Sequence, residues 1–415
     1  MTQIDLGWGA GPSSRYDALA APFRPIFARI REKAVERELT HTLPHEEIGW
    51  LKTVGFSTLR VPTEYGGLGV TLPEFFALLI ELSEGEPNVT NALRSHFGFT
   101  EDVLVSADAN WRRTWLGRIA ARETIGSGFS EVGDNKVGVF STRLVREGDH
   151  WRLNGKKFYT TGSLFADWVN LGATDENGEG VGALVPTSAN GVEIIDDWDG
   201  FGQALSASGT ALFNEVLIEP QLVNPPGGRF KYADGFFQLV HLATLAGVGR
   251  AGANDVARLV AERTRVYGHG NASRVSQDAQ ILQVVGKVRG AAYAAGAVAL
   301  KAAESLQRAY DAHFAGDPDA EERANAIAEI EVSQSVTPVT NLILDASTVL
   351  FDALGASAAK KGLGLDRHWR NARTIASHNP RIYRDRIVGD FAVNGTRPPV
   401  RYGVGQAVVP EPAKV

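Results

Sequence analysis

The hydrophobic period of the chain changes twice, and this pattern constrains the fold more than any other feature of the sequence. Up to about Arg122, apolar residues recur at the three- and four-residue spacing of amphipathic helices. Between Thr124 and about Pro220, short alternating segments stand between turn dipeptides such as Asn154-Gly155. Closely spaced turns of this kind predict a small antiparallel sheet or barrel. After residue 228 the helical period returns.

These changes predict an α+β chain that is mostly α. We expect an N-terminal α-helical domain at 1–122, a middle β-barrel or sheet domain at 123–228, a C-terminal four-helix bundle at 229–395 and an extended tail at 396–415. The periodicity predicts helices over Tyr16–Glu38, Glu46–Val54, Leu72–Glu84, Asn91–Ala107, Ala109–Arg122, Phe236–Val266, Val275–Ala315, Ala320–Leu354 and Arg381–Asn394. Strands are expected at Trp151–Leu153, Val169–Ala173 and Ala211–Leu217.

Composition narrows the class of function. A net charge of −6 argues against a nucleic-acid partner and a membrane surface. The absence of cysteine excludes disulfides, thiolate nucleophiles and thiolate metal sites, and it fits a cytoplasmic protein. The nine histidines are scattered, so we expect no metal site. No basic segment followed by an apolar run opens the chain, and no run of about 18 apolar residues occurs.

Chemically distinctive residues are concentrated at Leu365–Pro380. This stretch holds three arginines, two histidines, a tryptophan and a proline. Guanidinium groups bind phosphates and carboxylates well, and histidine changes charge near neutrality. On spacing alone, however, His378 is better interpreted as the residue that ends a helix before Asn379-Pro380.

The strings RHWRNAR (367–373) and SHNP (377–380) resemble the C-terminal signature of flavin-dependent monooxygenases with the acyl-CoA dehydrogenase fold, in particular the dibenzothiophene monooxygenases. The string VPTEYGGLG (61–69) is also similar to what relatives of this fold carry. The resemblance extends from Val61 to Pro399. It implies a helical domain, a β domain and a helical bundle, with the flavin between the last two, in a homotetramer.

The resemblance gives His378 a catalytic place over the flavin ring. One large subgroup of acyl-CoA dehydrogenases carries its catalytic glutamate where this chain has Asn379, and an amide has no useful pKa for a general base. The remaining chemistry is that of a reduced flavin, which reacts with dioxygen to give a C4a-hydroperoxide, and His378 would deliver the proton. His96 aligns with a second pocket histidine and is a further catalytic candidate, although a lone histidine is more often a core residue.

The resemblance also suggests cofactor contacts. Each residue named in this paragraph can also be explained without a cofactor, as part of a polar loop, an exposed strand or a solvated helix face. Thr161 sits where relatives place a hydroxyl near the flavin N5, so it is also a catalytic candidate. Either Arg263 or Arg265 would bind the flavin phosphate. The predicted cofactor-binding residues are Ser127, Ser130, Tyr159, Thr160, Thr161, Ser163, Arg263, Arg265, Trp369, Arg370, His378 and Asn379.

The sequence therefore predicts one component of a two-component monooxygenase. It would use FMNH2 from a separate NAD(P)H-dependent flavin reductase, together with O2, to oxygenate a small organic substrate at sulfur in a sulfide, thiophene or sulfinate. FMN is favoured over FAD. The alternatives are an FAD-dependent acyl-CoA dehydrogenase, an N-oxygenase or aromatic hydroxylase on the same fold, and a non-catalytic flavin-binding scaffold.

Overall fold

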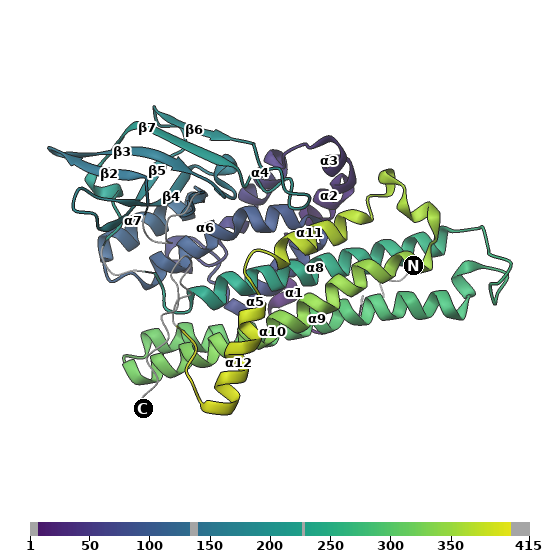
Figure 1. The fold of residues 1–415 in the computed structure, drawn as a ribbon. Coiled ribbons are helices and arrows are strands. Elements are labelled where there is room, and N and C mark those ends of the chain that lie inside the picture. Colours follow the sequence, from purple (N-terminus) through teal and green to yellow (C-terminus); the bar gives the residue numbers. More distant parts are fainter. Residues whose placement is uncertain (1–6, 133–139, 226–228, 400–415) are drawn as a thin grey trace, which may run out of the picture. The chain divides into compact units, whose positions relative to one another are not determined.

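The computed structural model describes residues 7–132, 140–225 and 229–399, which form two compact units (Figure 1). The helical unit comprises residues 7–122, 199–206 and 229–398. The β unit comprises the described parts of 123–198 and 207–228. Residues 199–206 thus belong to the helical unit although they lie inside the predicted middle domain, and the four predicted domain ranges stay predictions. From residue 400 onward, the predicted tail lies outside the described residues.

The first predicted helix, 16–38, is wrong as a single element. It is three short helices: α1 (Tyr16–Ala20), α2 (Arg24–Glu32) and α3 (Ala34–Thr40). Pro22 stands two residues after the end of α1 and has no N–H to donate to a helical carbonyl, and Pro25 lies in the first turn of α2. Lys33 then leaves the helical region with φ −107° and ψ 13°.

The other N-terminal helices lie close to their predicted positions. They are α4 (His45–Thr53), α5 (Leu72–Gly85), α6 (Pro87–Val105) and α7 (Ala109–Ala120). A capping box starts α5, because the Thr71 hydroxyl accepts from the Glu74 N–H while the Glu74 carboxylate accepts from the Thr71 N–H. This end of α5 is thereby fixed by its own local sequence.

Long helices form the rest of the unit, and α8, α9 and α10 run alongside one another (Figure 1). Their bounds are α8 (Ala233–Glu262), α9 (Ala279–Phe314), α10 (Pro318–Val349), α11 (Asp366–Ala376) and α12 (Ile382–Asn394). Small residues let them approach closely. At Gly247 of α8, an added Cβ would lie 2.4 Å from the Ser83 Cβ of α5, so only glycine permits this crossing.

The described residues of the β unit form one seven-stranded sheet with the order β1-β4-β2-β3-β7-β6, and β5 pairs with β4. The strands are β1 (Ile125–Gly128), β2 (Arg143–Glu147), β3 (His150–Lys157), β4 (Trp168–Thr174), β5 (Gly180–Pro186), β6 (Val192–Ile195) and β7 (Thr210–Ile218). The sheet is mixed rather than wholly antiparallel, because β1 runs parallel to β4, with Ile125 beside Trp168. Hairpin signals cannot show this pairing, since the two strands are not joined by a turn.

One face of the sheet carries the core of this unit. Alternating side chains from β2, β3, β4, β5 and β7 are buried together, among them Leu144, Leu153, Val169, Val185 and Phe213. Within the described ranges, we find no helix with the length and apolarity needed to cross a bilayer.

Residues 199–206 are anchored within the helical unit by α11 and α6. The Asn371 side-chain oxygen of α11 accepts from the Gln203 backbone N–H at 2.6 Å and from its side-chain amide at 3.2 Å. The Leu205 N–H donates to the Asn88 side-chain oxygen of α6 at 3.1 Å. Gln203 has a positive φ of 54°, which is uncommon without such restraint.

Replacing Asn371 tests this anchor. Asn371→Ala leaves the buried Gln203 N–H without its acceptor, so we expect the free energy of unfolding to fall by about 1–3 kcal/mol. Urea denaturation of the purified protein measures the change. Asn394→Ala is the control, because Asn394 is exposed and its side-chain amide donates to Asp390 of its own helix. Equal losses in the two variants would contradict the assigned role.

Candidate active site

His378 lies just beyond the end of α11 and is exposed, yet its ring nitrogens are both engaged. Its Nε2 lies 3.1 Å from the Nη2 of Arg94 on α6. Because a guanidinium can only donate, Nε2 must be the acceptor and the ring must be neutral. The remaining proton is then on Nδ1, which donates to the Asn379 side-chain oxygen at 3.4 Å. Although the residue is exposed, the protein packed around its ring and the charge of Arg94 lower the pKa of His378.

Asn379 extends this chain of donors into α8. Its side-chain amide donates to the Gln238 side-chain oxygen at 3.1 Å. The hydrogen bonds therefore run in one direction, from Arg94 through His378 and Asn379 to Gln238. Amides occupy the positions next to His378, and neither can remove a proton from a substrate.

Sequence reasoning missed His241, which lies beside His378. It is on α8, is 1% exposed, and its ring centre lies 4.4 Å from that of His378. In the described part of the chain, neither of its ring nitrogens has a hydrogen-bond partner. Burial, His378 and Arg94 together hold the pKa of His241 well below its usual value. The available signal was a histidine within the largely apolar run 236–248.

Arg94 is the second residue that sequence reasoning missed. Its guanidinium lies over the Phe237 ring at 5.0 Å, and that of Arg229 lies over the same ring at 4.9 Å. Burial and the like charge of Arg229 lower the pKa of Arg94 to about 10, so it remains a cation at neutral pH. Among the described residues no carboxylate forms an ion pair with Arg94.

His96 is held elsewhere. Its Nε2 lies 2.7 Å from the backbone oxygen of Ser57, and its ring contacts Phe97 edge-on. Arg94 and His96 are two residues apart on α6, so their side chains point in different directions, and Arg94 is the one that contacts His378. The catalytic role of His96 stays a prediction.

In the β unit, the predicted hydroxyl residues are used in two ways. The Thr160 hydroxyl and N–H both donate to the Gly209 oxygen, and the buried Ser163 hydroxyl donates to the Ser127 oxygen. These bonds hold the backbone around the loop. Thr161 is different, because its hydroxyl is half-buried and pairs with the hydroxyl of Ser208 at 2.7 Å. Either hydroxyl of this pair can be the donor.

Ser130 and Tyr159 are exposed on neighbouring loops of this unit. The Phe158 N–H donates to the Ser130 oxygen at 3.0 Å. Tyr159 has a positive φ of 58° and stacks its ring edge-on against Trp198. Beneath them, Lys157 and Glu131 form a 2.6 Å ion pair. Burial alone would raise the pKa of Glu131, but bonds from Lys157, Ser141 and Thr142 lower it to about 2.

Most cations of the 365–380 stretch are committed to the fold. Arg367 and His368 both contact Asp255 of α8 at 2.9 Å. Arg370 bonds to Glu38 at 2.6 Å and to Asp366 at 2.9 Å. Trp369 and Arg373 of this stretch have no carboxylate partner among the described residues. Trp369 is 39% exposed and stacks on Phe201, and Arg373 bonds to the Ser377 hydroxyl.

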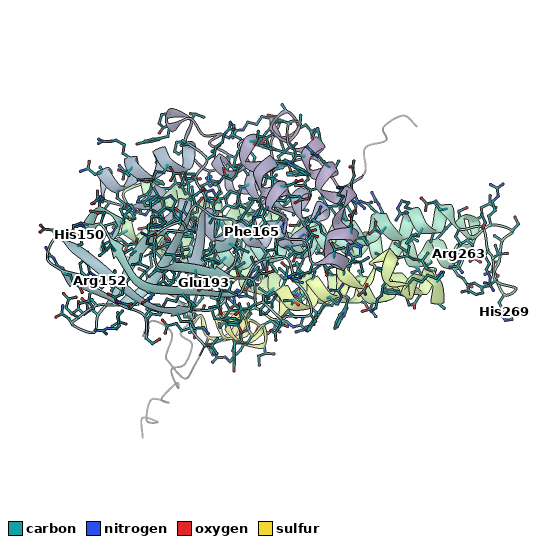
Figure 2. The ribbon with its side chains drawn as sticks, turned by 90° about the horizontal axis from the view of Figure 1, so that it is seen from above. His150, Arg152, Phe165, Glu193, Arg263 and His269 are labelled. Atoms are coloured by element: carbon teal, nitrogen blue, oxygen red, sulfur yellow. The ribbon has the colours of Figure 1, made fainter. Side chains whose placement is uncertain are left out.

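Arg263 and Arg265 lie in the segment that follows α8, in which Figure 2 labels Arg263 and His269. Arg263 is half-buried, and its guanidinium donates to the Leu354 and Arg265 backbone oxygens. Arg265 is exposed. The structure thus uses Arg263 within the chain and leaves Arg265 at the surface.

The buried His368 gives stability a defined pH dependence. Burial and Arg367 outweigh Asp255 and lower the pKa of His368 to about 4, against about 6.5 in an unfolded chain. The unfolded state therefore binds more protons as the pH falls from 6.5 towards 4, and stability is lost by up to about 3 kcal/mol over that range. Urea unfolding of wild type and His368→Gln at several pH values measures this loss of stability.

The comparison between these two proteins isolates His368, because His241 also has a lowered pKa and is present in both. We expect the His368→Gln variant to lose less stability than wild type over this pH range. Parallel pH profiles would assign the acid sensitivity to other groups.

Two family models match the chain. The acyl-CoA dehydrogenase N-terminal domain matches residues 19–123, and the acyl-CoA dehydrogenase C-terminal domain matches residues 239–380. Together they match more than half of the chain. The second match ends at Pro380 and so includes His241, His378 and Asn379.

Curated proteins and solved structures are similar over nearly the whole length. A probable FMNH2-dependent monooxygenase SfnC of Pseudomonas putida is 25% identical over 91% of this chain and 97% of its own. A dibenzothiophene monooxygenase of Rhodococcus qingshengii is 28% identical over 90% of this chain and 93% of its own. The structure of TdsC from Paenibacillus sp. A11-2 with FMN and indole superposes with a TM-score of 0.83 at 24% identity, over 93% of this chain and 98% of that one.

Proposed function

Because the chain belongs to the acyl-CoA dehydrogenase family, we propose that it acts within that family as an FMNH2-dependent monooxygenase, which oxygenates a small organic substrate at sulfur. Similarity over nearly the full length to proteins named as monooxygenases supports this, and dibenzothiophene is itself a sulfur compound. The observation that carries the proposal is the directed chain Arg94–His378–Asn379–Gln238. It offers a titratable imidazole and two amides where a dehydrogenase needs a carboxylate.

The side chains of the β unit fit a flavin in kind. Ser127 of β1 and Ser130 of the loop after it would bind the flavin, and the Thr161–Ser208 pair would offer a hydroxyl. The exposed Tyr159 would contribute an aromatic face. Thr160 and Ser163 would contribute by fixing the backbone, since their hydroxyls are already used. When bound, reduced FMN supplies two electrons and activates dioxygen.

The flavin phosphate calls for a cation that is not already paired. Arg370 is paired with Glu38 and Asp366, and Arg263 donates to backbone oxygens. We therefore assign the phosphate contact to Arg265, which is exposed. Trp369, stacked on Phe201, would be an apolar neighbour of the cofactor rather than a donor to it.

His378 would manage the proton of the reaction. One oxygen atom of O2 goes to the substrate sulfur and the other leaves as water, and FMNH2 supplies both electrons. The departing oxygen needs a proton. Because the lowered pKa leaves the His378 ring neutral near pH 7, His378 would donate this proton only after taking one up at Nε2. Asn379 and Gln238 would orient the ring through Nδ1, which leaves Nε2 facing Arg94.

The protein would depend on other components. Use of FMNH2 calls for a separate NAD(P)H-dependent reductase, which would associate only transiently. We also propose a homotetramer in the cytoplasm, in line with the fold family. The assays below would also reveal a preference for FAD, activity on acyl-CoA substrates, or oxygenation at nitrogen or aromatic carbon.

A substrate panel tests the reaction. We expect the protein, supplied with FMNH2 and O2, to add one oxygen atom to at least one of a set of sulfides, thiophenes and sulfinates, as measured by mass spectrometry. Labelling with 18O2 should place one labelled oxygen in the product. Oxygenation of amines or phenols alone would contradict the choice of sulfur.

His378→Ala tests the proton donor. Because the ring is exposed, we expect the variant to fold and to bind FMN, but to release hydrogen peroxide in place of oxygenated product. The ratio of product to FMNH2 consumed should fall about 100-fold, within the range typical of general acids. A ratio equal to that of wild type would remove His378 from the mechanism.

Cofactor preference is a separate expectation. In an anaerobic titration, FMNH2 should bind at least about tenfold more tightly than oxidised FMN, because a two-component enzyme must capture the reduced form and release the oxidised one. Tighter binding of FAD, or bleaching of a bound flavin by an acyl-CoA, would favour a dehydrogenase.

A further inference from the structure

We propose that Arg94, His241 and His378 form a binding site for the sulfinate group of the substrate, and that occupation of this site is what allows His378 to take up a proton. This inference rests on the proposed function, because it narrows the substrate class from any sulfur compound to an anionic one. It assigns roles to two residues, Arg94 and His241, that lie outside the sequence motif ending in His378.

His241 is the first observation. A buried imidazole normally has a partner for each nitrogen, and an unpaired one carries a desolvation cost. His241 is 1% exposed, and within the described part of the protein both of its nitrogens are unpaired. Its ring lies against that of His378, with the two ring centres 4.4 Å apart. A sulfinate oxygen would accept a hydrogen bond from it.

Arg94 is the second observation. A partly buried cation usually faces a carboxylate, since an unbalanced charge is costly to remove from water. In the described residues Arg94 instead faces His378 and the Phe237 ring, and its Nε has no partner. A guanidinium matches the two oxygens of a sulfinate as it matches those of a carboxylate.

Acidic groups on the neighbouring elements are already engaged. Asp102 of α6 lies 3.5 Å from Arg229 and accepts from the Phe230 N–H. Glu101 of α6 is bound by Arg60 and Tyr232. On α10, Glu329 is bound by Arg384. The charge around His241 and His378 is therefore positive, which favours an anion.

The hydrogen bond between Arg94 and His378 couples binding to protonation. Without an anion, Arg94 donates to His378 Nε2 and occupies the lone pair that a proton needs. A sulfinate that draws the Arg94 donors to itself frees Nε2, and its negative charge also favours the imidazolium. The proton donor is thus charged only when the substrate is present. Because binding takes up a proton, sulfinate affinity should rise as the pH falls from 8 to 6.

A matched pair of ligands tests the site. Benzenesulfinate and methyl phenyl sulfoxide have similar shapes, but only the first is charged. In calorimetric titrations of FMN-saturated protein, we expect benzenesulfinate to bind at least tenfold more tightly, and more so at pH 6 than at pH 8. Equal affinity for the two ligands in wild type would overturn the proposal.

Substitutions locate the site. Arg94→Gln should weaken benzenesulfinate binding about 10- to 100-fold, as expected for the loss of a charge-assisted hydrogen bond, and leave sulfoxide binding unchanged. Arg94→Lys should recover part of the affinity and shows that the fold is retained. Arg258→Gln is the control, because Arg258 lies on α8 but is exposed and paired with Glu262. If Arg94→Gln weakened FMN and not benzenesulfinate, the cation would serve the flavin phosphate and the proposal would fall.

NMR titration of the His378 ring gives a readout independent of turnover. Its pKa should rise on adding benzenesulfinate to wild type and stay constant in Arg94→Gln; a constant value in wild type would overturn the coupling.

The binding and oxygenation experiments can give different outcomes, and these outcomes separate the two proposals. If neutral sulfides are oxygenated and sulfinates do not bind, this inference fails and the proposed function stands. If sulfinates bind through Arg94 and nothing is oxygenated, the anion site stands and the monooxygenase proposal fails.

Discussion

A guanidinium donates hydrogen bonds and never accepts them. This fixes the direction of each hydrogen bond in the chain from Arg94 through His378 and Asn379 to Gln238. Arg94 makes Nε2 of His378 an acceptor, which puts the ring proton on Nδ1 and directs it to Asn379, whose amide then donates to Gln238. One fixed donor on α6 therefore sets the tautomer of the candidate proton donor and the orientation of two amides. A lysine in its place would not impose the same planar geometry.

The arginines and histidines of the 365–380 stretch fall into two groups according to the partners that they contact. Arg367, His368 and Arg370 contact carboxylates and hold α11 against α8 and the N-terminal helices. Asn371 of the same helix anchors residues 199–206. In the proposed function, the reactive part of the stretch is its last few residues, where His378 accepts from Arg94. A dense run of arginines and histidines thus combines a structural anchor with the edge of a site.

The sequence predicted the helices well where periodicity was long, because a buried face leaves a regular pattern. It failed at 16–38, where the apolar spacing continues through a break between two helices that contains Pro22. The parallel pairing of β1 with β4 leaves no local trace. Motif similarity gave His378 and Asn379 their roles, and these roles stay predictions. Arg94 and His241 were missed because they come from α6 and α8, and only the fold brings them to His378.

Asp255 contacts two arginines and a histidine at once, since Arg31 of α2 lies 3.3 Å from it in addition to Arg367 and His368. A single carboxylate that balances three partners makes their evolution interdependent. A lineage that replaced Asp255 by a neutral residue would keep several poorly solvated positive groups, and selection would then favour replacing them as well. Positions 31, 255, 367 and 368 should therefore change together among homologous sequences, as a set rather than one by one.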